Sequence, residues 1–142
     1  MSTKQLTTFY ADGRYFGIEV TKVQEVLRYR EMTQAPLAKH EIRGLINLRG
    51  QIVVALDLRR RLGLPERDEA SLPMNVVVRS DGASISLLVD EIGDVLEVDE
   101  ALFEELPETL RAGRNFVRGA YKVDGRLLVE LDLDKVIDIT SG

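Results

Sequence analysis

Two stretches of the 142-residue chain decide its fold: RGLINLRGQIVVALDL at residues 43–58 and RGAYKVDGRLLVELDL at residues 118–133. They are identical at seven of 16 positions, including the opening Arg-Gly and the closing Leu-Asp-Leu. A second pair, residues 12–27 and 81–96, shares five of 16 positions in the same chain order. The two matches indicate a duplication. Lobes of about 65–70 residues lie near the minimum size for a core, so we expect them to share an apolar joint.

Short strands joined by tight turns fill most of the sequence. Asp-Gly pairs at residues 12–13, 81–82 and 124–125, together with Arg49-Gly50, each separate two apolar stretches. That pattern is typical of two-residue β-hairpins. Many short strands at this spacing indicate small β-barrels rather than a layered α/β fold.

We expect a few short helices between the strands, over residues 20–26, 57–62 and 99–106. Valines at helical spacing favour the first helix, and Gly63 or Pro65 ends the second. Asp57 and its equivalent Asp132 each follow a strand, and we expect both to cap the helix that comes next.

The sequence contains few of the side chains and motifs that catalysis requires. The chain contains no cysteine, and its one histidine, His40, lies in a polar stretch. No GxSxG, GxGxxG or GxxxxGK[ST] motif occurs, and the acidic residues show no metal-ligand spacing. We therefore expect no enzyme activity, no cofactor and no metal, and a hydrolase that uses His40 is only a third alternative.

The charge is divided between the two halves of the chain. Residues 1–71 carry a net +3 and residues 72–142 a net −8, which sum to −5. Opposite signs at two ends favour head-to-tail contact with a partner, whereas a net negative chain disfavours nucleic acid. The acidic excess gathers at Glu97, Asp99, Glu100, Glu104, Glu105 and Glu108.

Basic residues in the first half leave a second interpretation open. Arg59, Arg60 and Arg61, with Arg67 nearby, could touch phosphate in a small nucleic-acid-binding barrel. Three bases on one short helix are more often a solvated face. The chain has no secretory signal, and no apolar run approaches the ~18 residues that span a bilayer, so we expect a cytoplasmic protein.

Arg49 and Glu25 are the residues best suited to recognition. An arginine at a tight turn offers five donors in a rigid fork to a carboxylate, and Glu25 carries the opposite charge. Two interpretations stay open: the residues pair with each other or with solvent, or they recognise a partner.

Three ordered motifs resemble those of the CheW-like family. Residues 42–59 resemble its GxxNLRGxxxPxxDLR signature, with Ala55 where proline is usual. Residues 22–26, KVQEV, resemble its KVQEI helix, and residues 84–96 resemble its GlvVDgVxdVl segment. The resemblance extends over residues 5–139.

The resemblance implies an all-β fold with a few short helices: two five-stranded SH3-like barrels sharing an apolar joint. One CheW-like domain would span residues 5–140. Its first lobe would span residues 14–80, and its second lobe residues 5–13 and 81–140.

The resemblance also implies that the first strand of each copy sits in the other lobe. Residues 6–12 would then join the second barrel, and residues 75–80 would join the first.

The family implies a function as well. Its members are non-catalytic adaptors that couple the cytoplasmic tips of methyl-accepting chemoreceptors to the regulatory domain of a CheA-type histidine kinase. Such an adaptor works in the cytoplasm at membrane-associated receptor arrays, without nucleic acid or membrane insertion, in flagellar, pilus or other chemosensory pathways. Receptor tips enter an apolar groove between the lobes, and the kinase packs on the barrel ends. By motif match, the coupling residues are Val23, Glu25, Gly44, Arg49 and Gly50.

Overall fold

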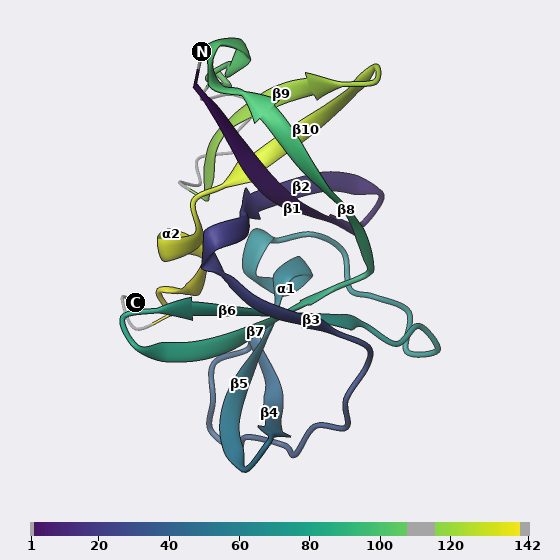
Figure 1. The fold of residues 1–142 in the computed structure, drawn as a ribbon. Helices are drawn as coiled ribbons and strands as arrows, with labels where there is room; N and C mark the ends of the chain where they lie inside the picture. The colour runs from purple at the N-terminus through teal and green to yellow at the C-terminus, as the bar shows by residue number, and fades with distance from the viewer. Residues whose placement is uncertain (1, 108–115, 140–142) are drawn as a thin grey trace.

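A computed structural model describes residues 2–107 and 116–139 of the chain (Figure 1). The strands are β1 (Thr3–Ala11), β2 (Arg14–Glu19), β3 (Val23–Leu27), β4 (Ile42–Leu48), β5 (Gln51–Asp57), β6 (Met74–Ser80), β7 (Ala83–Val89), β8 (Glu91–Asp99), β9 (Val117–Val123) and β10 (Arg126–Leu131). The helices are α1 (Leu58–Leu62) and α2 (Leu133–Ile137), and the 3-10 turns are η1 (Val20–Lys22) and η2 (Glu100–Leu102).

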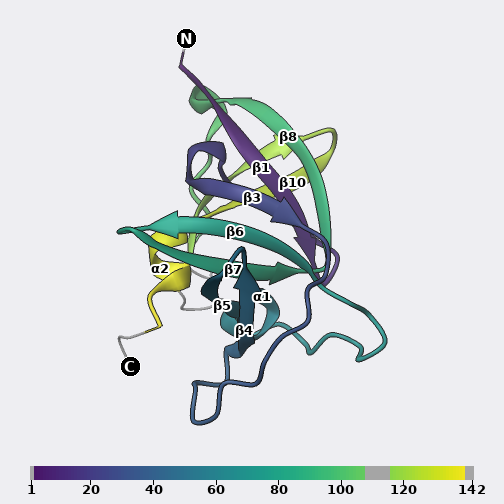
Figure 2. The ribbon, with the colours of Figure 1, turned by 60° about the horizontal axis from the view of Figure 1, so that its bottom comes forward.

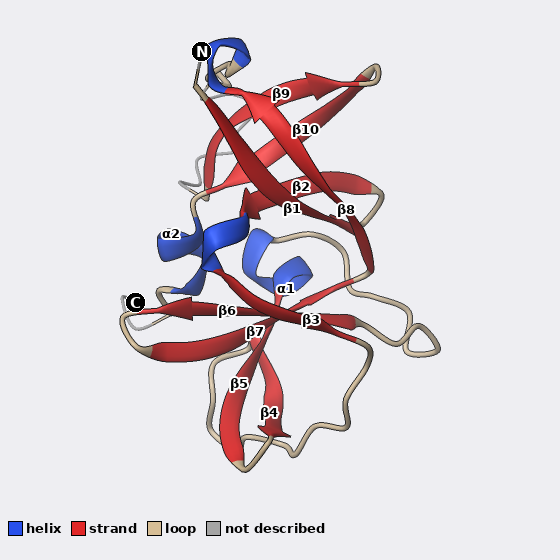
Figure 3. Cartoon of the chain, viewed as in Figure 1, coloured by secondary structure: helices blue, strands red, loops and turns tan. Residues whose placement is uncertain are grey.

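The strands form two five-stranded sheets, with α1 and α2 at the level between them (Figures 1 and 3). The order of one is β3-β6-β7-β5-β4, which we call the first lobe. The order of the other is β8-β1-β2-β10-β9, which we call the second lobe. The prediction of an all-β fold with two five-stranded, SH3-like units is confirmed. Each sheet is open rather than a closed barrel, because the two strands at its edges do not pair with each other. These edge strands are β3 and β4 in the first lobe and β8 and β9 in the second.

Strand register shows the duplication in three dimensions. In the first lobe, β5 pairs in parallel with β7, and Val54 lies opposite Ile85. In the second lobe, β10 pairs in parallel with β2, and Val129 lies opposite Phe16. Val129 follows Val54 by 129 − 54 = 75 residues, and Phe16 precedes Ile85 by 85 − 16 = 69, the offsets at which the sequence repeats. The two lobes are therefore structural copies as well as sequence copies.

All four predicted hairpins form, and each turns through two residues with positive φ. Such a pair of left-handed residues matches the twist of the flanking strands. The first turn residue is Asp12, Arg49, Asp81 or Asp124, with φ between 49° and 53°, and the second is always glycine.

The lobe boundaries differ from those predicted. β2 was expected in the first lobe but pairs with β1 and β10 in the second lobe. β7 was expected in the second lobe but pairs with β6 and β5 in the first lobe. The reason is that a two-residue turn makes both strands of a hairpin move together. Strands β1 and β6 lie in the lobes expected for them, and their hairpin partners accompany them. The predicted domain end at residue 140 lies outside the described residues.

Two predicted helices are wrong for most of their length. Residues 20–26 form η1 and then β3, whose half-buried and exposed side chains alternate as in a strand. Branched valines favour the extended backbone, and hydrogen bonding to β6 stabilises this segment as a strand. In residues 99–106, only η2 is helical, with the Asp99 carboxylate accepting a hydrogen bond from the Ala101 N–H.

The third predicted helix is confirmed as α1. The Asp57 carboxylate accepts from the backbone N–H of Arg59, and Gly63 ends the helix at φ 74°. Asp132 caps α2 in the same way, by accepting from the backbone N–H of Lys135. Both aspartates therefore have the capping role expected of them.

The largest core cluster lies between the lobes, as predicted for the shared joint (Figure 2). It takes buried side chains from both sheets and both helices, whereas the clusters inside each lobe are smaller. The buried members of this joint are Phe9, Ala11, Phe16, Ile18, Leu56, Leu58, Val76, Val78, Leu87, Val89, Leu131, Leu133, Val136 and Ile137.

Gly44 allows the backbone of the loop after β3 to lie directly against β4 in the first lobe. The loop after β3 reaches β4 through a bridge between Thr33 and Leu45, with N···O distances of 2.8 and 2.7 Å. A Cβ atom added at Gly44 would lie 2.7 Å from the Thr33 carbonyl oxygen. Gly119 has the equivalent position beside Glu104 in the second lobe. Glycine is required at both places because a backbone atom occupies the space of a side chain.

We expect Gly44→Ala to lower the free energy of unfolding by about 1–3 kcal/mol, because the Thr33 backbone must shift to admit the methyl group. Urea denaturation checks this. Gly17→Ala is the matched control, since its new Cβ would meet the flexible Leu128 side chain at 3.3 Å and should cost less. A Gly44→Ala variant as stable as the original chain would contradict the prediction.

Candidate functional site

The structure brings together two of the five predicted site residues. Glu25 on β3 and Arg49 in the β4–β5 turn form an ion pair. Gly50 completes that turn at φ 85°. Val23 is half-buried and packs against the joint between the lobes, and Gly44 is buried beneath the loop described above. Glu25, Arg49 and Gly50 therefore lie together at one hairpin, whereas Val23 and Gly44 pack inside the fold on the strands β3 and β4.

The Glu25–Arg49 pair has bidentate geometry. Arg49 Nη1 donates to Glu25 Oε2 and Arg49 Nη2 donates to Glu25 Oε1, each at 2.6 Å. The hydrogen bonds from Arg49 hold the pKa of the Glu25 carboxyl below its usual value. The Arg49 side chain remains 67% exposed and the Glu25 side chain 19% exposed. Because exposed pairs add only about 0–1 kcal/mol to stability, fold stability alone is a weak reason for this pair.

Arg49 occupies a backbone position that the other hairpins give to aspartate. Its φ of 52° lies in the left-handed region, which Asp and Asn tolerate better than long side chains. A residue held in a disfavoured conformation at an exposed turn points to a role in function. The guanidinium is thereby fixed at the tip of a hairpin, with its fork aligned on one carboxylate.

Exposed aliphatic side chains lie on the strands that carry this pair. Val26 on β3 is 40% exposed, and Ile52, at the start of β5, is 66% exposed. Their equivalents in the second lobe, Val95 on β8 and Leu127 on β10, are 53% and 43% exposed. Apolar side chains exposed at repeated positions are typical of contact surfaces.

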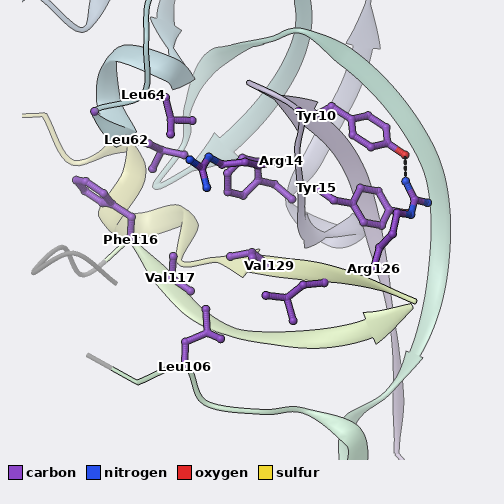
Figure 4. A pocket seen from close by; sticks show the side chains of 14 residues that line it. Tyr10, Arg14, Tyr15, Leu62, Leu64, Leu106, Phe116, Val117, Arg126 and Val129 are labelled. Atoms are coloured by element: carbon purple, nitrogen blue, oxygen red, sulfur yellow. Dashed lines mark hydrogen bonds between the residues drawn. The ribbon is translucent and has the colours of Figure 1, made fainter. Parts of the chain in front are cut away.

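An apolar groove of about 760 Å³ lies between the lobes (Figure 4). One wall comes from the end of α1 in the first lobe and the other from strands of the second lobe. Arg126 lies 4.3 Å from the centre of the Tyr15 ring, and its Nη1 donates to the Tyr10 hydroxyl at 3.0 Å. None of the five predicted site residues lines this groove. The lining residues include Tyr10, Arg14, Tyr15, Phe16, Leu62, Leu64, Phe116, Val117, Leu127 and Val129.

Sequence reasoning did not identify the groove residues. Tyr10 and Tyr15 flank the first Asp-Gly turn, and Arg126 follows the last one. Their places beside hairpin turns were the one sign in the sequence that could have pointed to these residues. Their meeting depends on the parallel pairing of β2 with β10, which no local pattern encodes.

The arginines of the nucleic-acid alternative are used inside the fold, so the expected solvated face is wrong. Arg59 binds Asp90, Arg60 binds Glu66, and Arg61 binds Glu41. The Arg67 side chain is 2% exposed and contacts Asp57 and Asp90. These pairs leave α1 without the free basic footprint that phosphate binding needs.

His40 is largely exposed, and its Nε2 lies 3.5 Å from a Glu66 oxygen. Within residues 2–107 and 116–139, no group of three or more His, Asp or Glu side chains could hold a metal ion. No helix in that part of the chain is long and apolar enough to cross a membrane. Five of the six acidic residues noted in the sequence lie on or next to β8 and η2, and Glu108 lies outside the described residues.

Fold and site together define a two-lobed β-protein with exposed aliphatic side chains at repeated positions and an exposed ion pair at a hairpin turn. The sequence pattern of the CheW-like domain matches residues 5–141. The chain therefore belongs to the CheW-like family.

Individual relatives agree with this assignment. The chain is 29% identical over 140 residues to the chemotaxis protein CheW of Bacillus subtilis, covering 98% of this chain and 90% of that protein. It is 29% identical over 114 residues to Protein PilI of Pseudomonas aeruginosa, covering 80% and 64%. The crystal structure of scaffolding protein TtCheW from Thermoanaerobacter tengcongensis superposes with a TM-score of 0.87 at 26% identity, covering 100% of this chain and 92% of that one.

Arg49→Asn should leave the free energy of unfolding within about 1 kcal/mol of the original value. The variant loses an exposed ion pair but gains an Asn-Gly turn, which suits two left-handed residues. Thermal and urea denaturation measure the change. A loss of several kcal/mol would show that the Glu25–Arg49 pair supports the fold.

Acid should destabilise the protein partly through Asp90. Burial alone would raise the pKa of Asp90, but hydrogen bonds from Arg59, Arg67 and the Asp12 backbone outweigh burial and lower it. A carboxyl with a lowered folded-state pKa adds stability above its unfolded pKa of about 3.9, and this is lost as pH falls through the folded value.

Asp90→Asn should therefore lower the free energy of unfolding at pH 7 by on the order of 2 kcal/mol and flatten its decline below about pH 5. Urea denaturation across pH 2–7 (roughly the titration range of carboxyls) tests this. Asp81→Asn, at an exposed turn, is the control. An equally steep decline in the Asp90→Asn variant would contradict the prediction.

Proposed function

We propose that this protein is a non-catalytic adaptor of a chemosensory array, which couples methyl-accepting chemoreceptors to a CheA-type histidine kinase. The observation that carries the proposal is the bidentate Glu25–Arg49 pair, held on an exposed and conformationally disfavoured turn inside the family's motif. Chemotaxis and scaffolding are the roles that the names of its relatives state.

The adaptor acts by contact and not by turnover. Asp57 and Asp132 cap helices, Asp90 pairs with Arg59, and Gly50 and Gly44 serve backbone geometry. Such a protein transmits a signal only if a partner binds one arrangement of its surfaces better than another. Its place of action is the cytoplasm, at the membrane-associated arrays that hold the receptors.

The receptor surface follows from the pair itself. The cytoplasmic tip of a chemoreceptor is helical, and such a helix docks with apolar side chains ringed by charge. β3 offers Val26 beside Glu25, and the edge strand β8 repeats the arrangement with exposed Val95. The Arg49 side chain is 67% exposed, so a receptor carboxylate can approach its guanidinium from solvent.

The kinase surface lies at the lobe ends. Ile52 and Leu127 are exposed at equivalent positions of the β4–β5 and β9–β10 hairpins. A regulatory domain of similar two-lobed shape can pack on one such end and leave the other free for a further partner. Val23 and Gly44 contribute by fixing β3 and β4.

Binding of the purified chain to a receptor-tip fragment and to the kinase tests the proposal directly. Arg49→Asn and Glu25→Gln should each weaken receptor binding or kinase coupling by about tenfold, the effect of about 1.4 kcal/mol. Isothermal titration and kinase activation in reconstituted arrays provide the readouts.

Asp81→Asn is the matched control, because it places the same Asn-Gly turn at the β6–β7 hairpin, which carries none of the residues proposed for contact. It should bind and couple like the original chain. Failure of the unmodified chain to bind either partner would overturn the proposal. Unchanged coupling by both pair variants would remove Glu25 and Arg49 from the site.

A further inference from the structure

α1 carries three consecutive arginines with similar burial but different partners. The side chains of Arg59, Arg60 and Arg61 are 16%, 21% and 14% exposed. Arg60 stays within its own lobe, donating to Glu66 and to the His40 carbonyl oxygen. The other two reach residues tied to the second lobe.

Arg59 reaches the second lobe through Asp90, which lies in the crossover from β7 to β8. Arg59 Nε and Nη2 donate to the Asp90 carboxylate at 3.1 and 2.6 Å. Asp90 is itself anchored to the β1–β2 hairpin, because its backbone N–H donates to the Tyr10 carbonyl oxygen and its carboxylate accepts from the Asp12 N–H. Arg59 Nη1 also lies 3.8 Å from an Asp12 oxygen.

Arg61 reaches the second lobe through the end of α2. Its Nε donates to the Val136 carbonyl oxygen at 2.7 Å, and its Nη2 donates to those of Lys135 and Asp138 at 3.0 and 2.7 Å. The last carbonyls of a helix lack partners inside it, so a guanidinium satisfies them well. The same guanidinium lies 4.7 Å from the centre of the Phe116 ring.

These contacts differ in kind from the apolar joint beside them. Apolar burial is non-directional and holds surfaces together at many relative angles. Multidentate hydrogen bonds from a planar guanidinium require defined directions. Replacing a whole buried ionic pair by apolar groups is often nearly neutral for stability, so stability alone does not account for these contacts. The second copy lacks these arginines, since Asp134 stands where Arg59 does and Val136 where Arg61 does. Asp134 contacts Ser80 and Lys22 through single carboxylate oxygens, at 3.3 and 3.9 Å, and not through a planar fork.

We propose that α1 is an interlobe clamp in which Arg59 and Arg61 fix the angle between the two lobes, while Arg60 has no part in it. The clamp sets the shape of the groove, whose first-lobe wall is the end of α1, and the relative placement of the two lobe ends. This inference concerns the chain alone and does not depend on the partners proposed above.

The absence of cysteine makes the clamp measurable. Cysteines introduced at exposed Gln51 in the first lobe and exposed Lys122 in the second lobe carry spin labels with no background site. Pulsed electron–electron double resonance then reports the distribution of distances between the lobes. We expect a wider distribution for Arg59→Met or Arg61→Met, and a wider one still with a shifted mean for the double variant.

Arg60→Met is the matched control, with the same substitution on the same helix at similar burial, and should leave the distribution unchanged. A folded double variant with the distribution of the Arg60→Met chain would overturn the proposal. If the double variant does not fold, Arg59→Lys with Arg61→Lys retains the charges but loses the planar forks. That variant should also widen the distribution, and an unchanged distribution would be equally decisive against the clamp.

Discussion

The fold depends on the apolar joint between the lobes. Each sheet has five short strands, and the cluster of buried side chains inside each lobe is small. Within residues 2–107 and 116–139, the joint is the largest cluster of buried apolar side chains, and it draws on both sheets and both helices. Burial of this apolar surface is what offsets the entropy of ordering the chain. The groove is lined in part by residues of this joint, and the exposed ion pair lies on strands that the joint holds in place.

Charged side chains add directional hydrogen bonds at the edge of the apolar joint. Arginines from one five-residue helix and the loop after it meet carboxylates and carbonyl groups at the edge of the joint. Groups that look in the sequence like a basic patch for nucleic acid therefore serve internal geometry. The Glu25–Arg49 pair differs from these groups, because its arginine is two-thirds exposed and lies in a turn at positive φ, and it is the pair that we propose for partner contact. Division of the charges between interior and surface fits a scaffold better than an enzyme.

Local patterns predicted the parts of the molecule that are local. The four glycine turns, the capping aspartates and the repeated motifs were visible because each depends on neighbouring residues. Residues 20–26 were misassigned because branched valines at helical spacing form a strand once β6 lies alongside. The pairing of Glu25 with Arg49 was one of two open interpretations. The groove and the clamp stayed hidden because they join residues that only the sheet order brings together, such as Arg61 and Val136.

Each half of the chain contributes a hairpin to the sheet of the other half, which means that the two halves cannot fold as separate proteins. The β1–β2 hairpin belongs to the same sheet as β8, β9 and β10 of the C-terminal half. The β6–β7 hairpin belongs to the same sheet as β3, β4 and β5 of the N-terminal half. Cutting the polypeptide at its midpoint would therefore yield two fragments that each lack strands from a sheet, not two smaller proteins. A single copy folded as each half is here would place its hairpin in the sheet of a second copy. Once fused, the two copies could no longer separate, though their surfaces were free to diverge.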